Sequence, residues 1–474
     1  MKARGLISHG FAVLLALGAL ALLLVERSGV EARWVWALRS LDIVLFLALG
    51  ADALLRWRAE PGRLGDLRGN WVELAALAAL TLLLLPFHFP LLDVLFREVA
   101  IAVVLIGRAR RSQELLAQLR LKPAFIMLPA FLLLIGFGAP WLMLPQATAD
   151  GRPTGLLDAL FTATSAVCVS GLAVKDTALH FGGLGQAVIL ILVQLGGLGI
   201  MTFSATLLIL LRRPVNILQQ AALQEVLDHD TLSGIRRMVW FIVLMTFSAE
   251  LLGAGLLAVV WHARFDSLPA TLWHALFHAV SAFCNAGFST FSDSLCRFRG
   301  DVSTQVILMA LIVLGGLGFV VVKDLRDLAV NRLFRPERRT LPLRVQSRLV
   351  LVVTFFLIVA GAAALYAIES GRSLAGLPVK ERIFVALFHA VSARTAGFNT
   401  VDLAQWSGGA LLVVMVLMFI GGSPGSTAGG IKTTTAAILW GTVLSELRRR
   451  DRPEIYRRTI PVEVIRKAVS LLVL

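Results

Sequence analysis

The sequence has only three cysteines in 474 residues, and two of them, Cys168 and Cys284, lie inside apolar stretches. They form neither a disulfide framework nor a metal-ligand spacing, so we interpret them as small packing residues. Paired carboxylates, a nucleophile triad and a cluster of metal ligands at catalytic spacing are also missing from the sequence. The sequence therefore predicts that the protein is not an enzyme and that it carries no organic cofactor.

Charged residues are scarce at 16%, whereas hydrophobic residues make up 57% of the chain and the mean hydropathy is +0.81. Apolar runs recur near the roughly 20 residues that a helix needs to cross a bilayer, which excludes a soluble core and predicts a polytopic membrane protein. The net charge of +15 would suggest nucleic acid in a soluble chain. Here the basic residues cluster between apolar runs, so we expect a lipid bilayer as partner and no nucleic acid.

The apolar runs predict transmembrane helices, because a helix satisfies its own backbone in lipid. The expected spans are 8–25, 35–55, 71–88, 91–107, 123–144, 183–211, 235–261, 303–322, 347–368 and 409–446, the last with a polar insert. Lysine and arginine fall in the loops of one side, which predicts a cytoplasmic N-terminus. No convincing cleavage site follows the basic, apolar start, so we interpret it as the first helix and not as a removed signal.

A short motif occurs three times on the predicted outer side. It reads "ALFTATSAVCVSGL" at 159–172, "ALFHAVSAFCNAGF" at 275–288 and "ALFHAVSARTAGF" at 386–398, with starts 116 and 111 residues apart. Each copy has about eight apolar, helix-compatible residues, enough for roughly half the hydrocarbon core at about 1.5 Å per residue, followed by an irregular stretch with a glycine. Each copy sits between two full spans. The predicted unit is therefore helix, re-entrant half-helix, glycine-containing loop, helix.

Such units predict a pore. Non-helical backbone at membrane depth is tolerated only where it is buried in protein or lines water. Carbonyl groups from several loops can replace the hydration shell of a cation, and the half-helices would direct their partially negative C-terminal ends to the same axis. Gly171, Gly287 and Gly397 close the loops, because a residue without a Cβ lets backbone face the ion. The alternative is that the copies are packed amphipathic hairpins left by duplication.

A double glycine follows each loop glycine after 25, 28 and 24 residues, in "QLGGLGIM", "VLGGLGFVVVK" and "FIGGSPGSTAGGIKT". The third copy is enlarged into a break of the last span. Its polar backbone and its Ser423, Ser426, Thr427 and Lys432 must then face water or an ion path, just below the filter. A phosphate-binding loop is a weak alternative, because Ile431 separates the last glycine from the lysine and no strand precedes the segment.

These residues resemble the Trk/Ktr/HKT superfamily of potassium uptake channels over about residues 122–474. The resemblance rests on "SAVCVSGL", "SAFCNAGFS", "SARTAGFNT" and above all "FIGGSPGSTAGGIKTTT". It implies pseudo-fourfold repeats around one K⁺ pathway, a homodimer, and a cytoplasmic nucleotide-binding ring subunit as regulator, in a bacterial inner membrane. Glycine at the key position of every filter implies K⁺ preference, whereas serine in the first filter goes with Na⁺. A Na⁺-permeable transporter of the same family is the weaker alternative.

By the same resemblance, K⁺ is the transported ion and binds to the backbone carbonyls of the filter loops. The implied filter residues are Val167, Cys168, Val169, Ser170, Gly171, Phe283, Cys284, Asn285, Ala286, Gly287, Arg394, Thr395, Ala396 and Gly397. The implied gating-loop residues are Gly421, Gly422, Ser423, Pro424, Gly425, Ser426, Thr427, Ala428, Gly429, Gly430 and Lys432. Arg394 is expected to brace its loop, with a surface position as the alternative. His278 and His389 are expected to be hydrogen-bonding core residues behind a filter.

The expected fold is an all-α polytopic membrane protein. Residues 1–111 are predicted as a four-helix block that resembles a voltage sensor, with candidate polar positions at Asp52, Arg56, Asn70 and Glu73. Only Arg97 lies within its fourth helix, which predicts a scaffold without strong voltage gating. An amphipathic linker follows at 112–122. Pore repeats are predicted at 123–213, 233–332 and 345–447, and 462–474 as the start of a fourth.

Extrapolating the repeat spacing places a fourth motif roughly at position 496, beyond Leu474. A filter with three walls would leave the cation under-coordinated. We therefore expect either an incomplete chain or a partner that supplies the fourth wall. The remaining alternatives are a truncated, non-conducting membrane protein or scaffold, and a secondary transporter with broken helices. The latter is weaker, because half-helices repeated in one orientation suit a pore better than inverted repeats.

Overall fold

The computed structural model describes residues 123–199, 232–334 and 343–448, and near the C-terminus 454–455, 458–460 and 462–473. The predicted block at 1–111, the linker at 112–122 and the part of the span 183–211 beyond residue 199 lie outside the described residues. The chain divides into two compact units. Of the described residues, 123–164 and 173–192 belong to the first, and 165–172, 193–199 and those from 232 onward belong to the second.

The described part of the first unit is built from apolar helices. They are α5 (Pro123–Leu142) and the N-terminal parts of α6 (Leu156–Val167) and α7 (Gly183–Leu198), with the short 3-10 helix η2 (Pro145–Ala147) after α5. Leu144 and Ala147 are fully buried and pack with Trp141 and Leu184. The helix α5 has no charged residue, as its apolar sequence at 123–144 predicts for a membrane helix.

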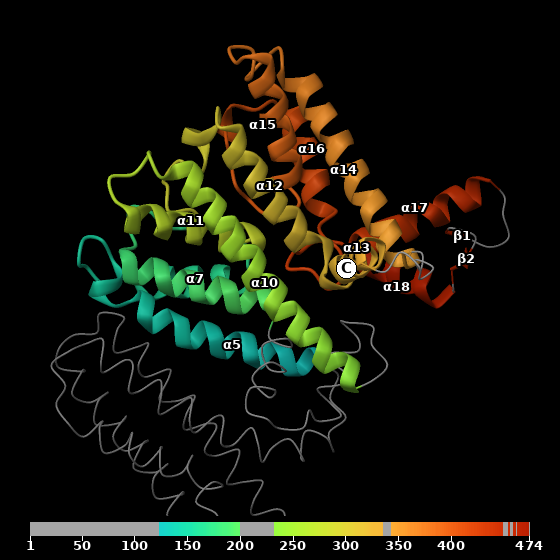
Figure 1. Ribbon diagram of the computed structural model, residues 1–474, viewed down its shortest axis with the longest axis horizontal. Helices are drawn as coiled ribbons and strands as arrows, with labels where there is room; N and C mark the ends of the chain where they lie inside the picture. The colour runs from blue at the N-terminus through green and yellow to red at the C-terminus, as the bar shows by residue number, and fades with distance from the viewer. Residues whose placement is uncertain are drawn as a thin grey trace, which may run out of the picture. The chain divides into compact units, whose positions relative to one another are not determined.

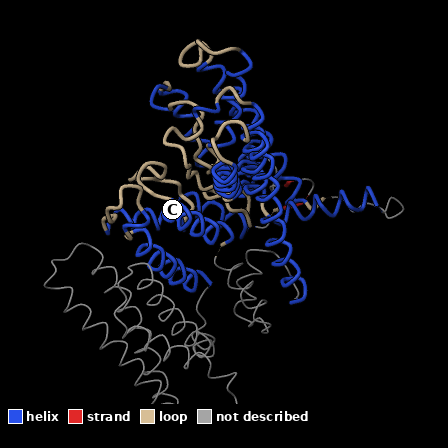
Figure 2. Tube along the Cα trace, turned by 60° about the vertical axis from the view of Figure 1, so that its left-hand side comes forward, coloured by secondary structure: helices blue, strands red, loops and turns tan. Residues whose placement is uncertain are grey.

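The second unit holds most of the described helices (Figure 1). Its elements are α10 (Leu232–Trp261), α11 (Leu268–Phe283), η3 (Cys296–Phe298), α12 (Val302–Leu317), α13 (Phe319–Phe334), α14 (Val345–Glu369), α15 (Val379–Ser392), η4 (Leu403–Gln405), α16 (Gly408–Phe419), α17 (Thr433–Leu447), β1 (Glu454–Ile455), β2 (Arg458–Thr459) and α18 (Val462–Val473). Strands β1 and β2 form an antiparallel pair, and the tube in Figure 2 shows that helices otherwise predominate in the described chain.

Two consecutive stretches of the second unit repeat one arrangement. A long helix packs against a shorter one, a loop follows, and a further helix returns, as α10, α11 and α12 and then α14, α15 and α16. The shorter helices α6, α11 and α15 have 12, 16 and 14 residues, so the prediction of about eight residues was too short. It counted only the apolar motif, whereas α11 begins earlier, where the Ser267 side chain accepts a hydrogen bond from the Ala270 N–H at 3.4 Å.

The predicted single span at 303–322 was wrong. The helix α12 ends at Leu317, and α13 leaves it with a bend of 106°. Gly318 lies between them with φ 86°, a conformation that glycine adopts without steric cost. The N–H of Phe319 donates to the carbonyl of Gly425 at 3.1 Å, far along the chain. A tertiary hydrogen bond therefore replaces a helical one, which hydropathy cannot reveal.

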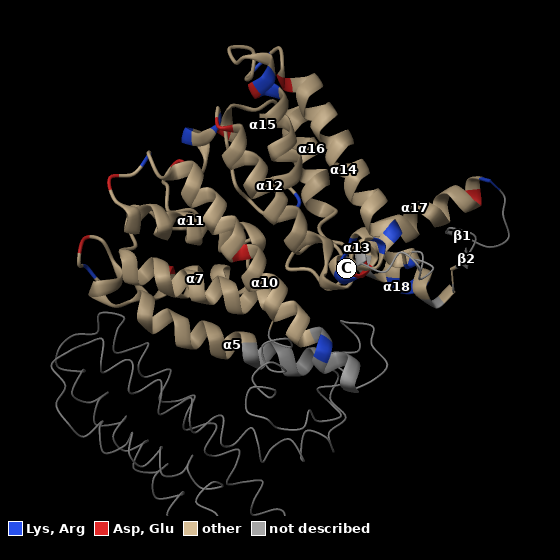
Figure 3. Ribbon diagram, viewed as in Figure 1, with Lys and Arg blue, Asp and Glu red and all other residues tan. Residues whose placement is uncertain are grey.

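Apolar composition marks the helices that are long enough to cross a membrane. Among the described residues these are Val239–Trp261 and Val345–Glu369, and the bent pair of α12 and α13 is a third if it counts as one span. They agree with the predicted spans at 235–261 and 347–368. In the second unit, many charged residues lie at helix ends and in loops, Glu250 lies within α10, and the middle of α14 and α16 carries none (Figure 3).

The C-terminal segment predicted at 462–474 forms the helix α18, which packs against α17. Its assignment to a fourth repeat stays a prediction.

Candidate functional site

Three loops with one geometry follow the C-terminal ends of the shorter helices. We name them filter loop 1 (168–172), filter loop 2 (284–288) and filter loop 3 (393–398). Each turns back on its helix through the same hydrogen bond, from Ser170 N to Ser165 O at 2.9 Å, from Ala286 N to Ser281 O at 2.8 Å and from Ala396 N to Ser392 O at 2.9 Å. The partially negative C-terminal ends of α6, α11 and α15 therefore lie at the loops, as predicted.

Each filter loop contains two residues with positive φ. The first is not a glycine: Val169, Asn285 and Thr395 have φ of 55°, 59° and 78°. The second is the motif glycine two residues later, with φ of 71°, 71° and 84°. Such non-glycine conformations cost about 1–3 kcal/mol each and persist only where the surroundings over-determine them, which is typical of functional sites.

The carbonyl oxygens of the loops lack hydrogen-bond donors. Within the part of the chain that the structure describes, no N–H or O–H group donates to the carbonyls of 168–171, 284–287 or 394–397. Residues 284–286 are nevertheless at most 1% exposed. The three loops therefore present backbone carbonyl oxygens that no donor of the described chain occupies.

The three loops lie side by side at their glycines. A Cβ on Gly171 would clash with the carbonyl oxygen of Ala286, and a Cβ on Gly287 would lie 2.5 Å from the carbonyl oxygen of Ala396. Filter loop 2 is thus enclosed between the other two, whereas Ser170 and Gly397 leave filter loops 1 and 3 partly exposed. The glycines therefore permit close approach of neighbouring loops, besides the backbone exposure that we predicted.

The serine of each "ALFxxxSA" motif holds its loop. The Ser281 hydroxyl donates to the Phe288 carbonyl at 2.7 Å, and the Ser392 hydroxyl donates to the Phe398 carbonyl at 2.6 Å. In the first copy, the Ser165 hydroxyl accepts a hydrogen bond from the Ser170 hydroxyl at 3.1 Å. The serine ties the end of the half-helix to the residue beyond the loop glycine in copies two and three.

The double glycines lie directly behind the filter loops. A Cβ on Gly196 would clash with the carbonyl oxygen of Val167, and a Cβ on Gly315 would clash with that of Phe283. Val167 and Phe283 occupy equivalent positions, four residues before the loop glycine. In the third copy Gly421 instead meets the carbonyl of Gly429. The first two double glycines therefore let the following helix support the inner end of a filter loop.

The helix break between α16 and α17 is a compact loop, which we name the intramembrane loop (420–432). Its two ends pair with each other, because the N–H of Gly421 donates to Ile431 O at 3.1 Å and the N–H of Ile431 donates to Phe419 O at 3.0 Å. The Lys432 ammonium donates to the Ala428 carbonyl at 2.7 Å, within the loop itself. The predicted interruption of the last span is confirmed, and part of its polar backbone is hydrogen-bonded within the loop.

The intramembrane loop contacts the break between α12 and α13. The N–H of Ser423 donates to Gly316 O at 3.0 Å, and the N–H of Thr427 donates to Gly315 O at 3.3 Å. Since a Cβ on Gly315 would also clash with the Phe283 carbonyl oxygen, the intramembrane loop lies next to the residue that precedes filter loop 2. The position just below the filter stays a prediction.

Arg394 is buried, with 8% of its surface exposed. Its guanidinium donates to the Gly421 carbonyl at 3.0 Å and to the Thr354 hydroxyl at 3.5 Å. The alternative of a surface arginine is therefore wrong. The side chain connects filter loop 3 with the start of the intramembrane loop, which extends the predicted role of bracing its own loop.

Comparison with known proteins agrees with this geometry. The family model of TrkH, described as cation transport protein, matches residues 92–473. The chain belongs to the TrkH family. The predicted resemblance is thereby confirmed, and the match begins at residue 92, inside the block predicted at 1–111. A family member with apolar helices of spanning length is a membrane protein.

Two curated relatives and one solved structure resemble the chain. The potassium/sodium uptake protein NtpJ of Enterococcus hirae is 35% identical over 353 residues, 74% of this chain and 76% of the relative. The Ktr system potassium uptake protein B of Bacillus subtilis is 34% identical over 363 residues, 76% of this chain and 79% of the relative. The crystal structure of the potassium transporter TrkH from Vibrio parahaemolyticus has a TM-score of 0.58 at 19% identity and covers 85% of this chain and 81% of that one. These relatives are transporters, in agreement with the predicted lack of enzyme activity.

The two histidines of the half-helices are core hydrogen-bonding residues, as predicted. His278 contacts the His274 carbonyl at 2.8 Å and the Ser289 hydroxyl at 2.9 Å, and none of its surface is exposed. The Nε2 atom of His389 accepts a hydrogen bond from the N–H of Thr400 at 3.4 Å. Among the described residues, no group of three or more histidine, cysteine or acidic side chains lies close enough to hold a metal ion.

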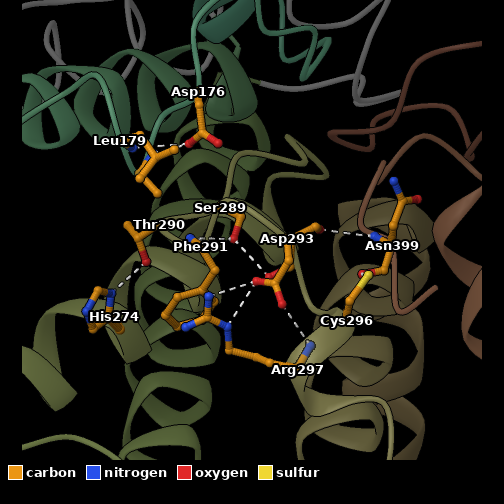
Figure 4. Close-up of polar contacts among 12 residues, drawn as sticks. Asp176, Leu179, His274, Ser289, Thr290, Phe291, Asp293, Cys296, Arg297 and Asn399 are labelled. Carbon is orange, nitrogen blue, oxygen red and sulfur yellow. Dashed lines mark hydrogen bonds and ion pairs between the residues drawn. The ribbon is translucent and has the colours of Figure 1, made fainter. Parts of the chain in front are cut away.

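The segments that follow filter loops 2 and 3 are linked (Figure 4). The N–H of Leu295 donates to Asn399 O at 2.9 Å, and the N–H of Asn399 donates to the Ser294 hydroxyl at 3.1 Å. An ion pair between Arg297 and Asp293 at 2.9 Å lies within the segment that follows filter loop 2. Burial raises the pKa of the nearby Cys296 thiol, so it remains protonated. These contacts join a segment six and seven residues beyond filter loop 2 to the residue that follows filter loop 3.

Sequence reasoning missed Glu250. It lies in the middle of α10, is 2% exposed and accepts a hydrogen bond from the Gln194 side-chain amide at 3.1 Å. The Cys284 thiol of filter loop 2 lies 3.8 Å from its other carboxyl oxygen. An ionisable residue inside an apolar span is a signal for a functional position, and this signal was present in the sequence.

We expect Glu250→Leu to lower the free energy of unfolding by about 1–3 kcal/mol, because the Gln194 amide loses its acceptor behind filter loop 2. Glu250→Gln keeps the shape and an acceptor oxygen, so it should cost less. Unfolding of the detergent-solubilised protein measures both. Equal stability of the leucine variant and the wild type would contradict the role of Glu250 as the partner of Gln194.

Proposed function

We propose that this chain mediates K⁺ uptake through a pore lined by the three filter loops. The observation that carries the proposal is the set of unpaired backbone carbonyls on three adjacent loops, two of which approach each other closely at Gly287 and Ala396. Neutral carbonyl oxygens replace the hydration shell of a monovalent cation without trapping it. The names of the relatives, which are potassium uptake or potassium/sodium uptake proteins, support the same cargo.

The preference for K⁺ over Na⁺ is part of the proposal. All three filters carry glycine at the key position, and Gly171 in the first favours K⁺ by the family resemblance. A Na⁺-permeable transporter is the second candidate, because the relative from Enterococcus hirae is named for both ions. Competition between the two ions in a flux measurement separates the candidates.

The intramembrane loop is proposed as the gate. It interrupts the last described span and lies against the inner side of filter loop 2, where Thr427 O–H donates to Phe283 O at 3.1 Å. Residues 421–430 and Lys432 are its proposed gating residues. Displacement of this loop would be required for an ion to leave the filter toward the predicted cytoplasmic side.

The partners and the placement in the membrane are likewise proposed. We infer a homodimer in the bacterial inner membrane, with a cytoplasmic N-terminus and a cytoplasmic nucleotide-binding ring subunit as regulator. One relative is named as part of a Ktr system, which supports a multi-component assembly. Because filter loops 1 and 3 have exposed edges, a fourth wall between them, from a fourth repeat or a partner chain, belongs to the proposal.

The test uses the native polypeptide, purified from its own membrane and reconstituted into liposomes. We expect influx of radioactive rubidium that K⁺ competes with more strongly than Na⁺, and rescue of potassium-uptake-deficient cells at low K⁺. Protein-free liposomes and cells with an empty vector are the controls. A folded protein that passes no rubidium and rescues no cells would favour the non-conducting alternative. Equal competition by Na⁺ would favour the second candidate.

A further inference from the structure

The hydroxyl of Thr427 joins the intramembrane loop to filter loop 2 through two hydrogen bonds. The Asn285 side-chain amide donates to this hydroxyl at 2.9 Å, and the hydroxyl donates to the Phe283 carbonyl at 3.1 Å. Asn285 is 1% exposed and is the left-handed residue of its loop, with φ 59°. The side chain of Asn285, the residue of filter loop 2 with a left-handed backbone, therefore contacts the proposed gate.

A second contact joins the intramembrane loop to filter loop 3. The Arg394 guanidinium donates to the Gly421 carbonyl at 3.0 Å, where the loop begins. Thr395, the left-handed residue of filter loop 3, places its methyl group 4.0 Å from the Cβ position of Gly429. The intramembrane loop thus contacts both filter loop 2 and filter loop 3.

Burial makes these contacts matter energetically. The Nε atom of Arg394 and the Oδ1 atom of Asn285 have no hydrogen-bond partner among the described residues. Buried polar groups cost free energy unless they are hydrogen-bonded. The hydrogen bonds to the intramembrane loop therefore offset much of the free energy that burial of the Asn285 and Arg394 side chains costs.

Several hydrogen bonds of Thr427 would break together if the intramembrane loop moved away. Thr427 N is bonded to Gly315 O, and Gly315 lies directly behind the Phe283 carbonyl. If the intramembrane loop moves away, Phe283 loses the hydroxyl that donates to its carbonyl. Asn285 also loses the acceptor of its side-chain amide. The surroundings then no longer hold its left-handed backbone in place.

We propose that Asn285 and Arg394 are positioning residues that latch the intramembrane loop to the filter, so that release of the loop also loosens filter loop 2 and lowers its selectivity between cations. This inference rests on the proposed function and deepens it. At filter loop 2, opening and ion discrimination are then linked through the hydroxyl group of Thr427.

The decisive variant is Thr427→Val, which keeps the side-chain shape and removes both hydrogen bonds. In liposomes that contain the Thr427→Val variant of the native polypeptide, we expect rubidium influx about tenfold above that of the wild type. Discrimination against Na⁺ should fall about tenfold, the factor that corresponds to about 1.4 kcal/mol. Thr427→Ser should restore both values, because it restores the hydroxyl. Asn285→Ala removes the partner of the same hydroxyl, so it should change influx and discrimination as Thr427→Val does. Combining the two substitutions should change either value little further.

The matched control is Thr442→Val in α17, which removes a hydroxyl that donates only to the Ile438 carbonyl of its own helix at 2.8 Å. It should conduct and discriminate like the wild type. A second readout, independent of conduction, is the thermal unfolding midpoint, in which the effects of Asn285→Ala and Thr427→Val should be non-additive.

The outcomes separate the two ideas. A wild-type protein that passes no rubidium refutes the proposed function, while the non-additive midpoints still show the contact. If the wild type conducts but Thr427→Val and Asn285→Ala keep its discrimination between rubidium and Na⁺, the latch proposal is overturned. Additive unfolding midpoints would also overturn it.

Discussion

Gly287→Ala is expected to reduce rubidium influx about 100-fold. The residue has φ 71°, and the new Cβ would lie 2.5 Å from the carbonyl oxygen of Ala396. The left-handed conformation costs a residue with a Cβ about 1–2 kcal/mol, and overpacking adds about 1–3 kcal/mol. A strain of about 3 kcal/mol corresponds to about two factors of ten. Influx into liposomes, with the amount of folded protein measured by size-exclusion chromatography, tests this expectation.

The matched control for Gly287 is Gly255→Ala in α10. Gly255 is also a glycine of the second unit, but no heavy atom lies within 4 Å of its Cβ position and its φ is not positive. Alanine there should leave influx unchanged and stabilise the helix by up to about 1 kcal/mol. Wild-type influx in Gly287→Ala would contradict the close approach of filter loops 2 and 3.

Gly315→Ala is expected to have the second largest effect, a loss of rubidium influx of about tenfold or more. The new Cβ would clash with the Phe283 carbonyl oxygen and would lie 3.0 Å from the Thr427 hydroxyl oxygen. Neither the filter backbone nor the intramembrane loop can withdraw without losing its own hydrogen bonds. Overpacking at a well-packed site costs about 1–3 kcal/mol, and 1.4 kcal/mol is one factor of ten.

The neighbouring glycine supplies the control for Gly315. The Cβ position of Gly316 is 3.9 Å from its nearest neighbour, the Asn285 side-chain nitrogen, which is ordinary van der Waals contact. We therefore expect Gly316→Ala to retain most of the influx. Equal losses in both variants would mean that the double glycine acts through helix flexibility and not through close approach to filter loop 2.

The sequence predicted the filter because its chemistry repeats locally. Three copies of one motif, each with an apolar, helix-compatible run and a glycine at the end of a short loop, indicated half-helices followed by turns. The observed hydrogen bonds of Ser281 and Ser392 to the loop ends span only seven and six residues. Contacts of such short range are encoded in the spacing of a motif. The interruption at 420–432 was likewise visible, because proline and several glycines cannot continue a helix.

Other features could not be predicted, because they depend on residues far apart in the chain. The bend at Gly318 looks like a continuous apolar span in the sequence and is held by Gly425 O, and Asn285 meets Thr427 across 142 residues. Glu250 could have been selected as an ionisable residue within a span, but its partner Gln194 could not. Hydropathy reports what a segment is compatible with, and it does not report which carbonyl a distant N–H will reach.

The sequence by itself determined the class of protein, the repeated unit and the residues that form the loops, since these depend on composition and on local spacing. The tertiary structure decided which loops lie side by side, why Gly196 and Gly315 must lack a Cβ, and how the intramembrane loop reaches the filter. The physical reason is the same in each case. Steric exclusion and buried hydrogen bonds act between surfaces that meet only when the chain is folded.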